Sequence, residues 1–303
     1  MKCKKYEMAN DIALSTNYAY LLRSTKAIVK DKESDKLLCE LKGLISPCGI
    51  SISTDERYIA IGDCTKNVVI VYDAERGHEI VTKLRLDSDQ KSTIYISFCN
   101  NEFVVAKGDS IYTVSRNFGK VRKSYQMPGS FCCGISKGKD SLLVLMKMIG
   151  TGQTQAPVGV FFSNGIAQRV DFELPHKEKI QAIVSSIFLV KDNSVYLPTI
   201  NEDYSTLGIW CVDINSGESR SLGRLKCDVL RLQSWSITPD GRLIVIRELL
   251  DKSMYRVSVF QSDNLECIIS KEIKNVYRIK SDENAIYVMG SGSYVFPYHV
   301  INR

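Results

Sequence analysis

The sequence contains very little histidine, no Cys-x-x-Cys motif and no long apolar run, and each shortage excludes a class of protein. Its 303 residues include only three histidines, which lie far apart at His78, His176 and His299. Metal centres and acid–base sites gather several imidazole, thiolate or carboxylate groups, and no such set can be proposed here. We therefore expect no catalytic residue, no metal ligand and no cofactor, although enzymatic activity stays open as an alternative.

No segment has the length and apolar character of a membrane-spanning helix. The longest apolar stretch, residues 142–149, contains a lysine and is much shorter than the roughly 20 residues that such a helix needs. Residues 1–7 are positively charged, but the apolar core of a secretory signal does not follow them. We expect a soluble, cytoplasmic protein with no membrane partner.

The cysteines are numerous, but their positions do not suggest cross-links. Ten occur in the chain, and Cys39, Cys211 and Cys267 lie inside strand-like segments. Without the Cys-x-x-Cys spacing of zinc and redox sites, the prediction is that the cysteines are buried, reduced thiols. Such thiols are typical of a reducing compartment.

The charge is mildly positive and dispersed. Lys and Arg number 40 and Asp and Glu number 34, for a formal net charge of +6. A nucleic-acid-binding protein usually concentrates its positive charge on one face or along one helix. The scattered pattern instead indicates a solvated surface of mixed charge and argues against a nucleic-acid partner.

What the chain does contain is a repeated unit of four short strands. Its clearest copy runs from Ile50 to Leu86: an apolar strand, a polar turn, two more apolar strands and an amphipathic fourth. Polar turns of the same kind, between the first two strands of each unit, recur at spacings of 38 to 54 residues. They begin at Thr16, Thr54, Cys99, Lys137, Lys191, Thr238 and Ser281.

Seven such units predict an all-β protein, a seven-bladed β-propeller of four-stranded antiparallel blades that occupies residues 1–303 as one domain. The last unit lacks a fourth strand, and the segment from Lys2 to Met8 can supply it, which would close the ring. Six blades with an N-terminal extension is the architectural alternative, because the first unit has short strands and a weak turn.

Parts of the repeat resemble a known family. Segments 53–60 (STDERYIA) and 71–77 (VYDAERG), and again 212–217 (VDINSG) and 238–242 (TPDGR), resemble the WD40-like and YVTN-type β-propellers. Tyr72-Asp73 stands where the Trp-Asp dipeptide of WD40 repeats would stand, but their Gly-His pair is missing. The resemblance implies a seven-bladed ring and leaves function open, because this fold hosts scaffolds and enzymes alike.

Three long insertions in successive units point to one functional face. They are Ile149 to Pro157, Asn201 to Gly208 and Leu250 to Met254, and all three should lie on the face that carries the connections between blades. We expect them to form a raised lip. Gly150-Thr151-Gly152 in the first insertion lacks the third glycine of a dinucleotide fingerprint, so we interpret it as a loop.

The candidate binding residues are aromatic, Arg and Gln side chains near the predicted channel mouth. Such side chains often anchor protein interfaces, but aromatic residues also pack between blades, and this alternative applies most strongly to Trp235, which lies inside an inner strand. The predicted partner-binding residues are Tyr95, Tyr204, Arg231, Gln233, Trp235, Tyr277 and Arg278.

These observations favour a non-catalytic scaffold that binds a protein or peptide on the face with the long loops. Two alternatives stay open: a lactonase-like or lyase-like propeller enzyme with its site at a channel mouth, and a carbohydrate or polyanion binder. The sequence leaves the oligomeric state and the identity of the partner undetermined.

Overall fold

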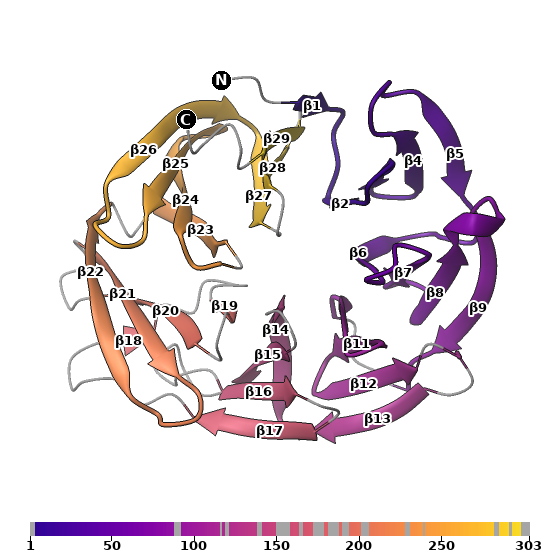
Figure 1. The fold of residues 1–303 in the computed structure, drawn as a ribbon, viewed down its shortest axis with the longest axis horizontal. Coiled ribbons are helices and arrows are strands. Elements are labelled where there is room, and N and C mark those ends of the chain that lie inside the picture. The colour runs from indigo at the N-terminus through magenta and orange to yellow at the C-terminus, as the bar shows by residue number, and fades with distance from the viewer. Residues whose placement is uncertain are drawn as a thin grey trace.

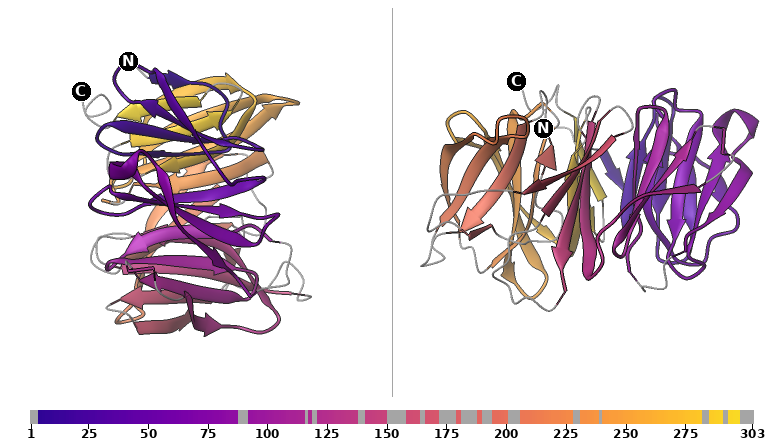
Figure 2. Two further views of the ribbon diagram at one scale, coloured as in Figure 1. Left: turned by 90° about the vertical axis from the view of Figure 1, so that its right-hand side faces the viewer. Right: turned by 90° about the horizontal axis from the view of Figure 1, so that it is seen from below.

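Seven β-sheets form a ring around a central axis (Figure 1). Within each sheet the strands follow one another from the axis to the rim, and from the side they run across the thickness of the ring (Figure 2). The computed structural model describes residues 4–87, 92–115, 117–118, 121–137, 141–149, 158–163, 166–171, 179–180, 188–189, 194–200, 206–227, 231–238, 240–281, 285–290 and 293–297.

The first four blades each consist of four antiparallel strands in chain order. Blade 1 contains β2 (Asp11–Leu14), β3 (Tyr18–Leu22), β4 (Ala27–Asp31) and β5 (Leu37–Leu41). Blade 2 contains β6 (Pro47–Ile52), β7 (Tyr58–Asp63), β8 (Val68–Asp73) and β9 (Glu79–Arg85). Blade 3 contains β10 (Tyr95–Cys99), β11 (Glu102–Lys107), β12 (Ser110–Ser115) and β13 (Val121–Gln126). Blade 4 contains β14 (Ser130–Lys137), β15 (Ser141–Met148), β16 (Val158–Ser163) and β17 (Ile166–Asp171).

The last three blades depart slightly from this scheme. In blade 5 two short strands, β18 (Lys179–Ile180) and β19 (Phe188–Leu189), both pair with β20 (Ser194–Ile200), which β21 (Thr206–Asp213) and β22 (Ser219–Lys226) follow. Blade 6 contains β23 (Leu232–Ile237), β24 (Leu243–Asp251), β25 (Met254–Gln261) and β26 (Cys267–Lys274). Blade 7 contains β27 (Val276–Ser281), β28 (Ala285–Gly290) and β29 (Ser293–Pro297), with β1 (Lys4–Tyr6) as its outer strand.

The prediction of seven four-stranded blades is confirmed. Along the chain, each predicted turn falls where the inner strand of a different blade ends and its second strand begins, although residues 138–140, 191–193, 239 and 282–284 of these turns lie outside the described residues. The six-blade alternative is wrong, because β2 to β5 form a sheet of their own within the ring. The predicted closure is also confirmed: β1 pairs antiparallel with β29, with Lys4 opposite Val295 and Tyr6 opposite Ser293.

The turns between the first two strands of blades 2 and 6 share one set of hydrogen bonds. The Ser53 hydroxyl donates to Asp55 at 2.6 Å and accepts from the backbone of Tyr58. In blade 6 the Thr238 hydroxyl donates to Asp240 at 2.5 Å and accepts from the backbone of Leu243. The two segments that most resemble known propeller repeats therefore form the same local structure, because a hydroxyl and an Asp two residues later satisfy the turn.

The Tyr72-Asp73 dipeptide has a structural role. The Asp73 carboxylate is buried, caps the short 3₁₀ helix η1 (Ala74–Arg76) by accepting from the backbone of Glu75 at 3.0 Å, and pairs with Arg57 at 2.9 Å. Burial opposes its ionisation, but the hydrogen bond and charge of Arg57 outweigh burial and lower the pKa of Asp73. Asp73 thus joins the turn after β8 to the turn after β6.

The core lies between adjacent blades. One cluster joins Val71 of blade 2 to Phe98 and Phe103 of blade 3, and further clusters fill the other junctions. Every residue of β28 is buried, which explains why its sequence is continuously apolar and not alternating. A sheet that packs on both faces requires such a sequence.

The prediction of reduced, buried cysteines is wrong at Cys48, Cys64 and Cys267, and Cys39 and Cys227 are only half-buried. Cys48 and Cys64 form a disulfide in blade 2, and Cys267 on β26 is exposed. Cys64 lies one residue beyond β7, diagonally across from Cys48 on β6, so the hairpin itself brings the two together. Cys132 and Cys133 are buried and form no disulfide, as predicted. Among the described residues no helix is long and apolar enough to cross a membrane.

Candidate functional site

The two faces of the ring differ in the segments that they carry. Successive strands of a blade are antiparallel, so the hairpins between second and third strands share one face with the connections between blades. We call this face the loop face; it includes residues 42–46 and 252–253. The opposite face, here the turn face, carries Asp55, Asp240 and Gly77. All inner strands begin at the loop face.

The predicted lip is only partly within the described residues. Residues 150–157 and 201–205 fall outside them. The third member, Leu250 to Met254, is no loose loop: β24 continues to Asp251, β25 starts at Met254 opposite it, and only residues 252–253 form the turn. This insertion therefore extends a hairpin of blade 6 at the loop face.

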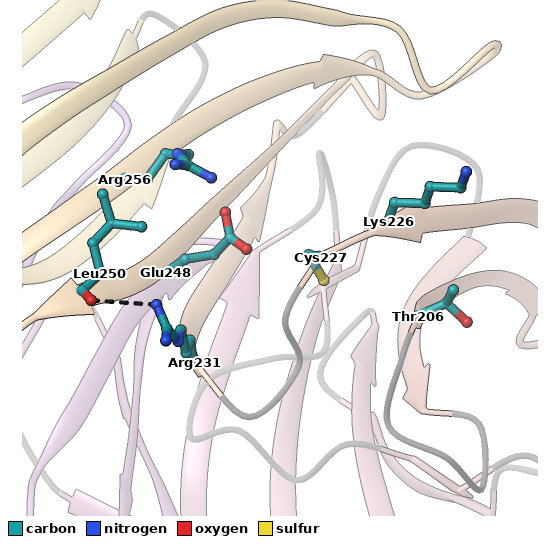
Figure 3. A pocket seen from close by; sticks show the side chains of 7 residues that line it. All are labelled: Thr206, Lys226, Cys227, Arg231, Glu248, Leu250 and Arg256. Atoms are coloured by element: carbon teal, nitrogen blue, oxygen red, sulfur yellow. Dashed lines mark hydrogen bonds between the residues drawn. The ribbon is translucent and has the colours of Figure 1, made fainter.

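A pocket of about 630 Å³ opens between blades 5 and 6 at the loop face. Figure 3 shows Arg231, Glu248, Leu250 and Arg256 of blade 6 on one side and blade 5 with Cys227 on the other. The pocket lies beside the extended hairpin, because Leu250, close to the turn of that hairpin, is one of its lining residues. Its lining residues are Thr206, Lys226, Cys227, Arg231, Glu248, Leu250 and Arg256.

Positive charge dominates the lining. Lys226, Arg231 and Arg256 are exposed, whereas Glu248, which is the one carboxylate among the described lining residues, is only 7% exposed. The Arg231 guanidinium donates to the Leu250 carbonyl at 3.3 Å, which holds the start of the inner strand against the hairpin (Figure 3). The side chain of Arg231 is thereby positioned at the rim of the pocket.

Two contacts connect the pocket to neighbouring charges. The Arg256 guanidinium lies 3.8 Å from the Glu272 carboxylate, and both side chains are about half exposed. The Arg224 guanidinium donates to the Thr206 hydroxyl at 3.3 Å. The ion pair between Arg256 and Glu272 is long and lies at the surface, so it contributes little energy, and Arg256 can still attract an anion.

β-Bulges at the loop face shape the inner strands. In blades 2, 4, 6 and 7 the register between the first two strands shifts by one, which leaves one extra residue on each inner strand. A bulge redirects the side chain of that residue out of the regular alternation. The extra residues are Gly49, Cys133, Gln233 and Tyr277.

Two predicted binding residues occupy such bulges. Gln233 is exposed, and Tyr277 is 52% exposed although tyrosine is largely apolar. Both lie near the loop-face end of neighbouring inner strands, and Gln233 is two residues from Arg231 of the pocket. The structure thus places these three predicted residues on the loop face of blades 6 and 7.

Arg278 lies in an ion-pair network across the ring closure. Its guanidinium lies 3.4 Å from the carboxylate of Asp11 in blade 1, and the Lys280 ammonium lies 3.3 Å from the same carboxylate. Burial raises the pKa of Asp11, but the charges of Lys280 and Arg278 outweigh burial and lower this pKa overall. Arg278 therefore has a structural role that joins blade 7 to blade 1.

The remaining predicted residues are placed as follows. Tyr95 is half-buried at the start of β10, where burial raises its pKa to about 12 although the charge of Arg278 acts in the opposite direction. Trp235 is 1% exposed and packs in the cluster between blades 5 and 6, so it contributes to the core and not to an exposed contact. Tyr204 lies outside the described residues.

The sequence reasoning missed most of the pocket. Lys226, Glu248 and Arg256 were not selected, because each lies within a strand whose register was unknown. The available signal was their position near the loop-face ends of three strands of neighbouring blades, β22, β24 and β25. No group of three His, Cys, Asp or Glu side chains that could hold a metal ion occurs within the described part of the chain. His78 packs against the rings of Tyr18 and Tyr20.

No protein-family model matches this chain, and no curated protein matches its sequence. Solved structures do match its fold. The propeller domain of Cps50 (Swd1) from Myceliophteria thermophila superimposes with a TM-score of 0.68 at 12% sequence identity, over 98% of this chain and 99% of that one.

Two further structures show how varied the proteins with this fold are. The WD40 repeats of RRP9 superimpose with a TM-score of 0.65 at 10% identity, over 97% of this chain and 99% of that one. Virginiamycin B lyase from Staphylococcus aureus superimposes with a TM-score of 0.65 at 15% sequence identity, over 98% of this chain and 99% of that one. The chain therefore has the fold of a WD40-like seven-bladed propeller, a fold that these structures show in a WD40-repeat protein and in an enzyme.

Proposed function

We propose that this protein is a scaffold that binds a protein or peptide on its loop face. One observation carries the proposal: the loop face carries both the charged pocket between blades 5 and 6 and two exposed side chains, Gln233 and Tyr277, at bulges of the inner strands of blades 6 and 7. Exposed Tyr and Arg side chains around a depression are typical of interface anchors.

The rigidity of the ring supports this function physically. Blades 6, 7 and 1 are joined around the channel: the Ser236 and Ser281 hydroxyls lie 2.7 Å apart, and Asp11 pairs with Lys280. The anchors are therefore held in fixed positions before a partner arrives. Binding then costs little ordering of the scaffold, which leaves more of the contact energy as affinity.

The test compares variants of the two faces. The loop-face variant is Gln233→Ala/Tyr277→Ala, and the matched turn-face control is Arg76→Ala/Arg242→Ala, whose side chains are 71% and 78% exposed. Each protein is immobilised, exposed to extract of the native host and analysed by quantitative mass spectrometry. We expect the loop-face variant to lose partners that the wild type and the control retain. Equal recovery by all three proteins would reject the loop face.

A further inference from the structure

We infer that the pocket between blades 5 and 6 recognises an acidic side chain of a peptide, either a carboxylate or a phosphate group. The inference rests on the proposed function, because it specifies which chemical group the loop face selects. It concerns a site that lies off the central channel, at the junction of two blades. Its lining is formed by described residues from both blades.

The balance of charge is the first argument. Among the described lining residues three cations, Lys226, Arg231 and Arg256, stand against one carboxylate, Glu248. Two further described residues lie next to the lining: Arg224 donates to Thr206, and Glu272 pairs with Arg256. They add one charge of each sign, so the positive excess among the described residues is unchanged. A recess with converging positive charge concentrates its field and attracts anions.

The donor chemistry is the second argument. Arg231 and Arg256 provide planar guanidinium groups that can bind a carboxylate or a phosphate with two parallel hydrogen bonds. They approach the pocket from β25 and from the residue before β23, with Lys226 on the opposite wall at the end of β22 (Figure 3). An anionic group in the pocket would therefore meet cations from two blades.

Size and the buried carboxylate favour a peptide over a free anion. A volume of about 630 Å³ exceeds what one phosphate or acetate ion fills and is in the range of sites for larger ligands. The Glu248 carboxylate reaches the pocket, and it can accept a hydrogen bond from a backbone N–H of the bound chain. The cationic side chains can bind the acidic side chain of a peptide residue, and the Glu248 carboxylate can accept from the backbone N–H of that residue.

An array of random-sequence dodecapeptides that includes phosphoserine tests the inference. We expect the peptides bound by the wild-type protein to be enriched in Asp, Glu or phosphoserine, and the variant Lys226→Glu/Arg231→Glu to lose this enrichment. The matched control Arg76→Glu/Arg242→Glu changes the same number of charges on the turn face and should retain it. The composition of the bound set distinguishes carboxylate from phosphate recognition.

A solution measurement completes the test. For the most strongly enriched peptide, fluorescence polarisation should show binding that is about ten-fold or more weaker in the pocket variant and weaker at high salt. Lys226→Glu alone serves as a second variant, because its exposed side chain has little part in folding. Circular dichroism verifies the fold of each protein.

The two proposals fail in different ways. Peptides that bind without acidic enrichment, and whose binding depends on Gln233 and Tyr277, would overturn the inference and leave the proposed function standing. Acidic enrichment that survives the pocket variants would also overturn the inference. Binding that depends on neither the pocket nor Gln233 and Tyr277 would overturn both proposals.

Discussion

The junction between blades 2 and 3 and the junction between blades 5 and 6 have different structures at the loop face. At the first, Gly49 and Gly62 allow Ile94 so close an approach that a Cβ atom on Gly49 would lie 2.4 Å from the Ile94 carbonyl oxygen. At the second, a pocket lined by charged residues opens at the same face of the ring. Deeper in both junctions the packing is apolar.

The residues at the inner-strand bulges of blades 2 and 6 differ as well. Blade 2 has Gly49 there, with a φ angle of +74°, and blade 6 has the exposed Gln233. A glycine lets the neighbouring backbone cover the bulge, whereas a long polar side chain keeps its position in contact with water. A bulge thus lies under the backbone of the next blade in blade 2 and carries an exposed side chain in blade 6.

The largest expected effect concerns the apolar base of the pocket junction. Trp235→Ala should lower the free energy of unfolding by about 3–5 kcal/mol, because it empties a large buried volume between blades 5 and 6. Gln233→Ala, two residues away on the same strand, should change it by less than about 0.5 kcal/mol. Urea unfolding of both variants measures the difference, and similar losses would contradict the assigned burial.

The closed junction can be tested with glycine replacements. Gly49→Ala should lower the free energy of unfolding by about 3–4 kcal/mol, because the added methyl group would clash with Ile94 and because alanine is strained in a left-handed conformation. Gly217→Ala is the matched control, since its φ angle is +73° and a Cβ atom there would meet no atom within 4 Å. Equal losses in urea unfolding would show that the junction is not tightly packed.

The disulfide also distinguishes blade 2: among the described residues, no other blade contains one. Cys48→Ala/Cys64→Ala should lower the free energy of unfolding by about 2–3 kcal/mol, because the cross-link spans 16 residues and restricts the unfolded chain. Cys267→Ala, at an exposed thiol, is the control. Mass spectrometry of the unreduced protein checks the bond directly, and two alkylatable thiols at these positions would disprove it.

The smallest effect is a pH dependence at the ring closure. The folded-state pKa of Asp11 is lowered, so its contribution to stability is present above its ordinary pKa of 3.8 and is lost as the pH falls through the lower folded value. Asp11→Asn should flatten the fall in unfolding free energy below about pH 4 without abolishing it, since Asp73 and Asp213 also have lowered pKa values. An unchanged slope would contradict the network of Asp11.

The blade count was predictable because its signals are local. A hydroxyl and an Asp two residues apart form the turns that begin at Ser53 and Thr238, and continuous apolar runs mark strands covered on both faces. The disulfide was missed because the bulge at Gly49 sets the diagonal approach of Cys48 and Cys64. No sequence pattern predicted the extra bulge residue at this position.

The candidate site could be predicted only in part. Aromatic and Arg character selected Arg231 and Tyr277, which are exposed on the loop face, but the same criterion selected the buried Trp235. Composition cannot distinguish an anchor from a core residue when both lie on one inner strand. Lys226 and Arg256 were missed because strand register decides which side chain reaches the pocket.

The sequence by itself determined the number of blades, the turns between their first two strands and the closure by the N-terminal strand. The blade number and the turns depend on hydrogen bonds and apolar patterns within a few neighbouring residues, and the closure follows from the fourth strand that the last unit lacks. Only the tertiary structure decided where the charged pocket lies, because Thr206 and Arg256 come from different blades and meet through packing. Bulges, covered junctions and converging charges are properties of neighbouring blades, which no single repeat contains.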